Sequence, residues 1–176
     1  MKKINVFLLA AALALFSVQA NAGKKVRWKL AMTWPSTLSP LADAPVKVAK
    51  LVKQMSGGDF TIRVYGKEKH KAPLGILDMV KNGQYQMGHS ASYYFKGKDI
   101  NTIFFTTVPF GMTAQEQYAW FYHGGGMELM QEVYDRFGVY SYPGGNTGVQ
   151  MGGWFKEKID SLDDLKGLKM RIPGLA

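Results

Sequence analysis

The sequence predicts an α/β protein, because short strand-like stretches alternate with helix-like stretches from residue 26 to residue 172. Of the 176 residues, 47% are hydrophobic and 13% are aromatic, so the chain can bury a substantial core. The sequence contains neither an internal repeat nor a low-complexity segment. These observations favour one domain and part of another, built from alternating strands and helices.

The first expected elements are a strand, a helix and a second strand. Residues 26–34 are predicted to form the first strand, which Pro35 stops. A helix is expected from Leu41 to Met55, because apolar residues recur at helical spacing and Ser56-Gly57-Gly58 follows. Residues 60–65 alternate with a period of two, which is typical of a strand.

The middle of the chain is expected to be mostly helical. A helix over residues 73–81, closed by Asn82-Gly83, and a strand over residues 86–91 are predicted, followed by a buried apolar stretch over residues 103–110. Thr113 and Glu116 are spaced as a capping box, in which the hydroxyl and the carboxylate each bond the other residue's backbone N–H. They should open an aromatic helix that Gly124-Gly125-Gly126 breaks before helix 127–137.

Three more strands are expected near the C-terminal end, over residues 139–142, 147–155 and 168–172. A turn at residues 143–146 and a helical turn capped by Ser161 separate them. The sequence stops just after the last of these strands, with no helix to cover it. Parallel sheets are usually covered on both faces, so we expect a C-terminally truncated protein whose second lobe is incomplete.

Residues 1–22 have the order of a secretory signal peptide. A basic start, Met1-Lys2-Lys3, precedes the apolar run Val6–Val18 and the small-x-small site Ala20-Asn21-Ala22. The apolar run is shorter than the roughly 20 residues that span a bilayer. We therefore predict cleavage after residue 22 and a periplasmic mature protein.

Composition and motifs exclude several functions. The chain has no cysteine, and so neither a disulfide nor a thiolate site. It lacks a Gly-x-Ser-x-Gly elbow, a His-Glu-x-x-His zinc motif and a phosphate-binding loop, so we predict that it is not an enzyme. The net charge is +9, but the longest basic cluster, residues 67–71, lacks interleaved aromatics, and export argues against a nucleic-acid partner.

The most informative polar residue is Arg171. In the predicted last strand it shares one face with Lys169, whereas Leu168, Met170 and Ile172 share the other. Such an arginine lies either on a solvated face or in a cleft. In a cleft, its planar guanidinium would hold a carboxylate through two parallel hydrogen bonds, which lysine cannot form. The residues alone leave both interpretations open.

Four segments together resemble the solute-binding proteins of TRAP transporters, the DctP-type family, and in particular the branch that binds 2-oxo acids and related monocarboxylates. They are Thr33-Trp34-Pro35, Met87–Tyr94, Val149–Phe155 and Leu168–Gly174, and the similarity runs in order across the mature chain. The resemblance implies a periplasmic-binding-protein-like architecture of two lobes around a cleft. Here the signal peptide would be residues 1–22, the first lobe residues 23–145, and the start of the second lobe residues 146–176.

The resemblance also implies a binding site. In the family a strand arginine forms a salt bridge with the substrate carboxylate, which matches Arg171, and in the 2-oxo acid branch a glutamine contacts both the ligand and a sodium ion, which matches Gln150. Family pocket residues correspond to Trp34, Tyr93, Tyr94 and Asn146, whereas Trp154 is expected to pack in the core. The Trp-Glu pair that helps to hold the ion falls beyond residue 176, so we expect no cofactor here and sodium only in a full-length form.

The expected function is therefore capture of a small carboxylate such as pyruvate and its delivery to the TRAP membrane permease subunits, with a homodimer as a further implication for the full-length form. Rival interpretations are a binding protein for an ABC-type or amino-acid uptake system and a fragment that binds nothing alone. A periplasmic lyase or hydrolase is a third. Product analysis would reveal the enzyme, and the neighbouring transporter genes would separate the two uptake systems.

Overall fold

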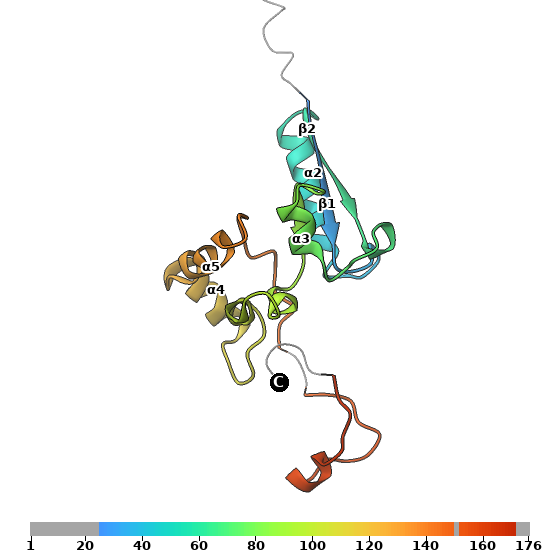
Figure 1. The fold of residues 1–176 in the computed structure, drawn as a ribbon, viewed down its shortest axis with the longest axis vertical. Coiled ribbons are helices and arrows are strands. Elements are labelled where there is room, and N and C mark those ends of the chain that lie inside the picture. The colour runs from blue at the N-terminus through green and yellow to red at the C-terminus, as the bar shows by residue number, and fades with distance from the viewer. Residues whose placement is uncertain (1–24, 150–151, 172–176) are drawn as a thin grey trace, which may run out of the picture.

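The computed structural model describes residues 25–149 and 152–171 (Figure 1). Strands and helices alternate along the first two thirds of the chain, as predicted. The strands are β1 (Val26–Met32), β2 (Phe60–Tyr65) and β3 (Met87–His89). The α-helices are α2 (Asp43–Met55), α3 (Ile76–Lys81), α4 (Ala114–His123) and α5 (Gly126–Asp135). Short 3-10 helices are η2 (Lys67–Lys69), η3 (Ser92–Phe95), η4 (Ile100–Phe105) and η5 (Leu162–Leu165).

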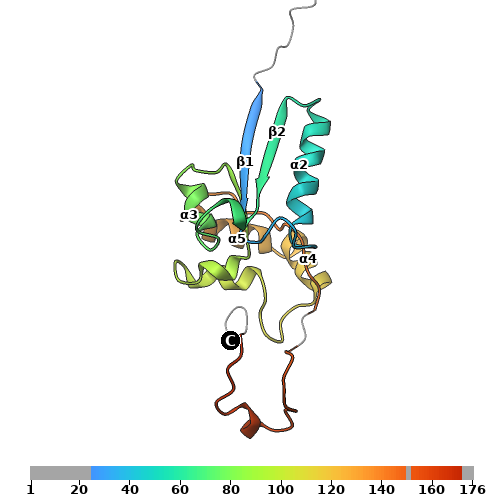
Figure 2. The same ribbon diagram turned by 90° about the vertical axis from the view of Figure 1, so that its right-hand side faces the viewer.

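The three strands form one parallel sheet in the order β2-β1-β3. Helices α2 and α3 lie on opposite sides of it, and α3 lies beside the carboxyl-terminal half of β1 (Figure 2). On the α2 side Leu30 and Met32 of β1 are buried with Ala42, whereas on the α3 side Ala31 is buried with Ile76 and Met79. Residues 30–32 thus point alternately to the α2 side and to the α3 side, which is the period of two expected of a strand.

A second core lies beneath α4 and α5. Leu77, Phe95, Phe105, Phe121 and Met130 are among its buried side chains. The predicted capping box begins α4: the Thr113 hydroxyl accepts from the Glu116 N–H at 3.4 Å, and Glu116 Oε2 accepts from the Thr113 N–H at 2.7 Å. The predicted break is also confirmed, because Gly125 takes a left-handed conformation (φ 81°) that allows α5 to start in a new direction.

The predicted strands near the C-terminal end are not formed. Residues 139–142, the described parts of 147–155, and residues 168–171 contain no strand, and Leu168 and Met170 are 39% and 38% exposed. A strand needs a neighbour to satisfy its backbone N–H and C=O groups, and in the described part of the chain none of these segments has one. Burial was overestimated for residues 103–110 as well, since Phe104 and Phe110 are exposed.

Residues 152–171 extend away from the sheet and the helices (Figures 1 and 2). They hold η5, which begins with the predicted capping box between Ser161 and Asp164. Trp154, expected in the core, is 89% exposed, which corrects that prediction. Within the described residues, no helix is both long enough and apolar enough to cross a membrane. The domain boundaries at residues 22 and 145 stay predictions, and the signal peptide lies outside the described residues.

Candidate functional site

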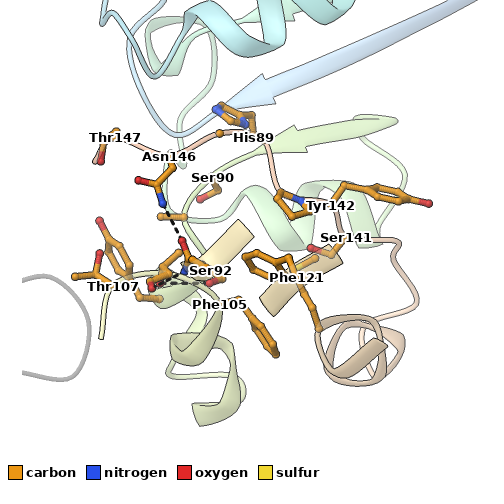
Figure 3. Close-up of a pocket in the computed structure, with 18 of the residues that line it drawn as sticks. His89, Ser90, Ser92, Phe105, Thr107, Phe121, Ser141, Tyr142, Asn146 and Thr147 are labelled. Atoms are coloured by element: carbon orange, nitrogen blue, oxygen red, sulfur yellow. Dashed lines mark hydrogen bonds between the residues drawn. The ribbon is translucent and has the colours of Figure 1, made fainter. Parts of the chain in front are cut away.

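A cavity of about 640 Å³ opens at the carboxyl ends of β1 and β3. Its other walls come from the region of η3 and η4, from α4 and α5, and from residues 139–149 (Figure 3). Ligands of open α/β sheets bind beyond the carboxyl ends of strands, so the cavity occupies the expected place. Its size is within the range of small-molecule sites.

Polar side chains follow directly from the two strands. The Thr33 hydroxyl, after β1, donates to the Ser90 hydroxyl, after β3, at 2.6 Å. The His89 Nε2 lies 3.0 Å from the Leu41 carbonyl oxygen. Because a carbonyl only accepts, Nε2 carries the proton and Nδ1 is left as an acceptor when the ring is neutral. The Trp34 ring meets the His89 ring edge-on, with centroids 5.1 Å apart.

Burial lowers the pKa of His89 below its usual value of 6.5, although the bond to the Leu41 carbonyl acts in the other direction. The folded protein therefore holds the neutral ring more strongly than the unfolded chain does. The resulting stability is complete above pH 6.5 and is lost as the pH falls from 6.5 towards the lowered pKa, because the unfolded state then binds an extra proton. Replacement of His89 should therefore reduce the loss of stability at low pH.

We expect His89→Gln to flatten the decline of unfolding free energy between about pH 7 and pH 5, by an amount on the order of 1 kcal/mol. Urea unfolding at both pH values measures it. The control is Gln115→Ala, at an exposed position of α4, which removes no titratable group and should leave the decline unchanged. An unaltered pH dependence in His89→Gln would show that this ring is not the group being titrated.

The far wall of the cavity is apolar with hydroxyl groups at its margin. Phe105, Phe121 and Met130 form the apolar part and are each at most 9% exposed. Tyr134 is 6% exposed and hydrogen-bonds with Ser92 and Ser141; burial raises its pKa to about 12, so its hydroxyl keeps its proton at neutral pH. This combination suits a small ligand with one polar end and one apolar end.

Asn146 links the segment after α5 to α4. Its Nδ2 donates to Gln117 Oε1 at 2.8 Å, and its Oδ1 accepts from the Gly148 N–H at 2.7 Å. Gln117 Nε2 donates in turn to the Thr106 carbonyl at 3.1 Å. Figure 3 shows Asn146 on the side of the cavity below His89. Two amides thus join η4, α4 and the strand-free segment that leads to residue 150.

The predicted residues are only partly brought together. Trp34, Tyr93 and Asn146 line the cavity. Tyr94 does not line it but packs against the core beneath α4 and α5, so its part in the site stays a prediction. Gln150 lies outside the described residues.

Arg171 is exposed and is not part of the cavity wall, yet it does not point away from the site. Its guanidinium hydrogen-bonds with Tyr93, and this bond and the neighbouring Tyr94 raise the pKa of Arg171. The rings of Tyr93 and Tyr94 are 4.5 Å apart. Burial and Tyr94 raise the pKa of Tyr93, and Arg171 opposes them. The end of the described chain therefore returns to the rim of the cavity.

The cavity wall carries no carboxylate. Among the described residues that line it, none is Asp, Glu, Lys or Arg, and no group of three or more His, Asp or Glu side chains in the described chain is arranged to hold a metal. Hard cations such as sodium or calcium prefer oxygen ligands, of which the wall offers hydroxyl, amide and carbonyl groups only. The described wall therefore offers neutral oxygen ligands without a carboxylate, and the binding of sodium or another ion stays a prediction.

Sequence reasoning missed Gln117, Ser92 and Tyr134. Ser92 lies within the segment Met87–Tyr94, but the resemblance does not assign it to the binding site. Gln117 had a detectable signal, since it is a polar residue one turn into a capped, otherwise aromatic helix. Tyr134 had none, because an aromatic residue on an amphipathic helix is usually core.

Comparison with known proteins adds independent findings. Residues 30–176 match the family described as bacterial extracellular solute-binding protein, family 7 (DctP). The chain is 48% identical over 159 residues to a monocarboxylate 2-oxoacid-binding periplasmic protein of Nostoc sp., covering 90% of this chain and 43% of that protein.

Two solved structures are similar. One is a TRAP periplasmic solute-binding protein from Pseudoalteromonas atlantica with bound sodium and pyruvate, at 68% identity and a TM-score of 0.83. The other, from Colwellia psychrerythraea, has bound calcium and pyruvate, at 67% identity and a TM-score of 0.84. Each match covers 86% of this chain and 46% of the solved chain. The chain thus spans less than half the length of these relatives.

Proposed function

Because the chain belongs to bacterial extracellular solute-binding protein family 7, the DctP family of TRAP systems, we propose that it captures a 2-oxo acid such as pyruvate and delivers it to the TRAP membrane permease subunits. The family and the relatives are solute-binding proteins, which confirms the prediction that the chain is not an enzyme. We propose further that residues 1–22 are a cleaved signal peptide and that the mature protein works in the periplasm.

The observation that carries the proposal is the position of Arg171. Its guanidinium contacts Tyr93 at the rim of a cavity whose described wall has no Lys or Arg of its own. A 2-oxo acid has a carboxylate at one end and a small apolar group at the other. In the proposed complex Arg171 grips the carboxylate through two charge-assisted hydrogen bonds, and the apolar end faces Phe105 and Phe121.

The cation lies on a different part of the chain from the cavity. Arg171 follows residues 152–170, which extend away from the body, whereas Tyr93 and the cavity belong to the body (Figure 2). A ligand held by both would bring the two parts together, as in hinge closure of binding proteins. Tyr93 keeps the guanidinium near the rim before ligand arrives, and Gln150 and Tyr94 are proposed to act beside it. Gln150 as a sodium ligand and homodimerisation of the full-length form stay predictions.

The test uses residues 1–176 continued by the remaining length of the Pseudoalteromonas atlantica relative, so that both halves of the relatives are present. Isothermal titration with pyruvate should give saturable heat. Propionate has a similar size and a carboxylate but no 2-oxo group, and should bind more weakly. The absence of heat with pyruvate, while circular dichroism shows a folded chimera, would refute the proposal.

Asn146 and Gln117 are expected to act by positioning. Gln117→Leu leaves Asn146 Nδ2 without its partner and releases the segment that precedes Gln150, so pyruvate affinity of the chimera should fall about tenfold. Gln115→Leu, two residues away at an exposed position of the same helix, is the control. Titration calorimetry of both variants measures the difference, and equal affinities would show that this amide pair does not position the site.

A further inference from the structure

The excess of positive over negative charge is confined to the first half of the chain. Residues 24–85 hold 12 of the 22 Lys and Arg residues and only 4 of the 13 Asp and Glu residues, whereas residues 86–176 hold eight and nine. Two more lysines lie in residues 1–22. The unit from β1 to the end of α3, residues 26–81, therefore carries about six net positive charges, and the region of α4, α5 and residues 152–171 is close to neutral.

Three of these cations lie together on one face of the sheet. Arg27 and Lys29 alternate with residues of the α2 side and so share the α3 side with Ala31. Arg63 of β2 is the register partner of Lys29, and Thr61 is the partner of Arg27. The first four residues of β1 are exposed, because α3 covers only the other half of the strand (Figure 2). We call Arg27, Lys29 and Arg63 the basic sheet face.

Aromatic rings and hydrogen bonds hold these cations in place. Lys29 Nζ lies 5.2 Å from the centroid of Tyr85, and the Arg63 guanidinium carbon lies 5.2 Å from that of Tyr65. The two tyrosine rings meet edge-on, with centroids 5.7 Å apart. Arg27 Nη1 donates to Thr61 Oγ1 at 2.8 Å.

The arrangement carries an electrostatic cost that no ion pair in the described part of the chain offsets. Like charges directly opposite each other on neighbouring strands are destabilising, and Lys29 and Arg63 are such a pair. The ion pairs of the described chain involve Lys98, Arg136, Lys158 and Lys166, and none involves the basic sheet face. An external anion would relieve this repulsion.

We propose that the basic sheet face docks the protein on an anionic phospholipid surface, with headgroup phosphates over Arg27, Lys29 and Arg63. The three cations come from two neighbouring strands and lie outside the cavity described above, so their spread along an exposed sheet face suits a plane of headgroups better than a single small anion. Tyrosine rings beside the cations are typical of side chains that sit at the water–lipid boundary. This inference goes beyond solute capture and does not depend on it.

The test is co-sedimentation of the exported, processed protein with vesicles of phosphatidylcholine alone or with about 30% phosphatidylglycerol. Binding is expected only with phosphatidylglycerol and should be lost between about 0.05 M and 0.5 M salt. Each cation near an anionic surface strengthens binding roughly fivefold. Neutralising all three, as Arg27→Gln, Lys29→Gln and Arg63→Gln together, should weaken it at least about tenfold.

The matched control neutralises Lys47, Lys50 and Lys53, which are exposed on α2 on the other side of the sheet and change the net charge equally. This control should bind nearly as well as the wild type. If both triple variants weaken vesicle binding equally, the net charge of the protein causes the attraction and the basic sheet face does not. That result would overturn the assignment. Retention on polyglutamate without vesicle binding would overturn it in favour of an acidic protein partner.

Urea unfolding distinguishes a role of these cations in docking from a role in stabilising the sheet. The sheet-face variant should remain folded in urea unfolding, because relief of the Lys29–Arg63 repulsion accompanies the loss of the tyrosine contacts and of the Thr61 hydrogen bond, so that weaker vesicle binding is not due to unfolding. Pyruvate affinity of the chimera should be unchanged by the same substitutions, which makes failure here distinguishable from failure of the proposed function. A variant that fails to fold would overturn the assignment by showing that these cations are needed for the sheet itself.

Discussion

Arg171→Ala is expected to weaken pyruvate binding by the chimera by about 2 kcal/mol or more, at least about 30-fold in Kd. The reason is that the described cavity wall holds no Lys or Arg of its own, so a bound carboxylate would lose its cationic partner at the rim. Arg171→Lys keeps the charge but loses the planar fork, so it should recover part of the affinity and not all of it. Isothermal titration of the three proteins measures both differences.

The control for this prediction is Lys169→Ala. Lys169 lies two residues from Arg171, is also an exposed cation, and has no bond to Tyr93 in the described structure. Its removal should leave pyruvate affinity within about twofold of the wild type. If Lys169→Ala and Arg171→Ala weaken binding equally, the positive charge of the segment matters and the individual guanidinium does not.

Phe121→Ala is expected to cost about 3–5 kcal/mol of unfolding free energy. Phe121 is 5% exposed and packs in the core that includes Leu77, Phe105 and Met130, so its removal leaves a void between α4 and η4. Urea unfolding followed by tryptophan fluorescence measures the loss. Phe121→Leu, which leaves a smaller void, should cost less and keeps the comparison measurable if the alanine variant does not fold.

Tyr122→Ala is the matched control, because Tyr122 follows Phe121 on the same helix and is 57% exposed. It should cost no more than about 0.5 kcal/mol. A control that destabilises as much as Phe121→Ala would mean that the helix, and not its buried face, sets the stability of this region.

The local elements could be predicted from the sequence because their causes lie within a few residues. Strand β2 was predicted with its exact bounds, and the capping boxes at Thr113 and Ser161 form as expected. The strands predicted at residues 139–142 and 168–172 had the same apolar alternation. They did not form in the described residues because alternation supplies a buried face but no hydrogen-bonding neighbour.

The candidate site was predictable in part. Trp34 and Tyr93 follow strands whose carboxyl ends meet at one edge, so their placement follows from the fold class. The amide pair of Asn146 and Gln117 spans 29 residues of sequence, and the bond from Arg171 to Tyr93 spans 78. Spacing in the sequence contains no information about such contacts, because the intervening chain can fold back in many ways.

The sequence by itself determined the alternating α/β pattern, the bounds of β2, the last residues of α2 and α3, and an excess of positive charge over the first half of the chain. These properties follow from side-chain period, capping and composition, which act locally. Only the tertiary structure decided which apolar stretches become strands and which side chains close the cavity. It alone also set Lys29 opposite Arg63, because register between strands arises when distant segments pack together.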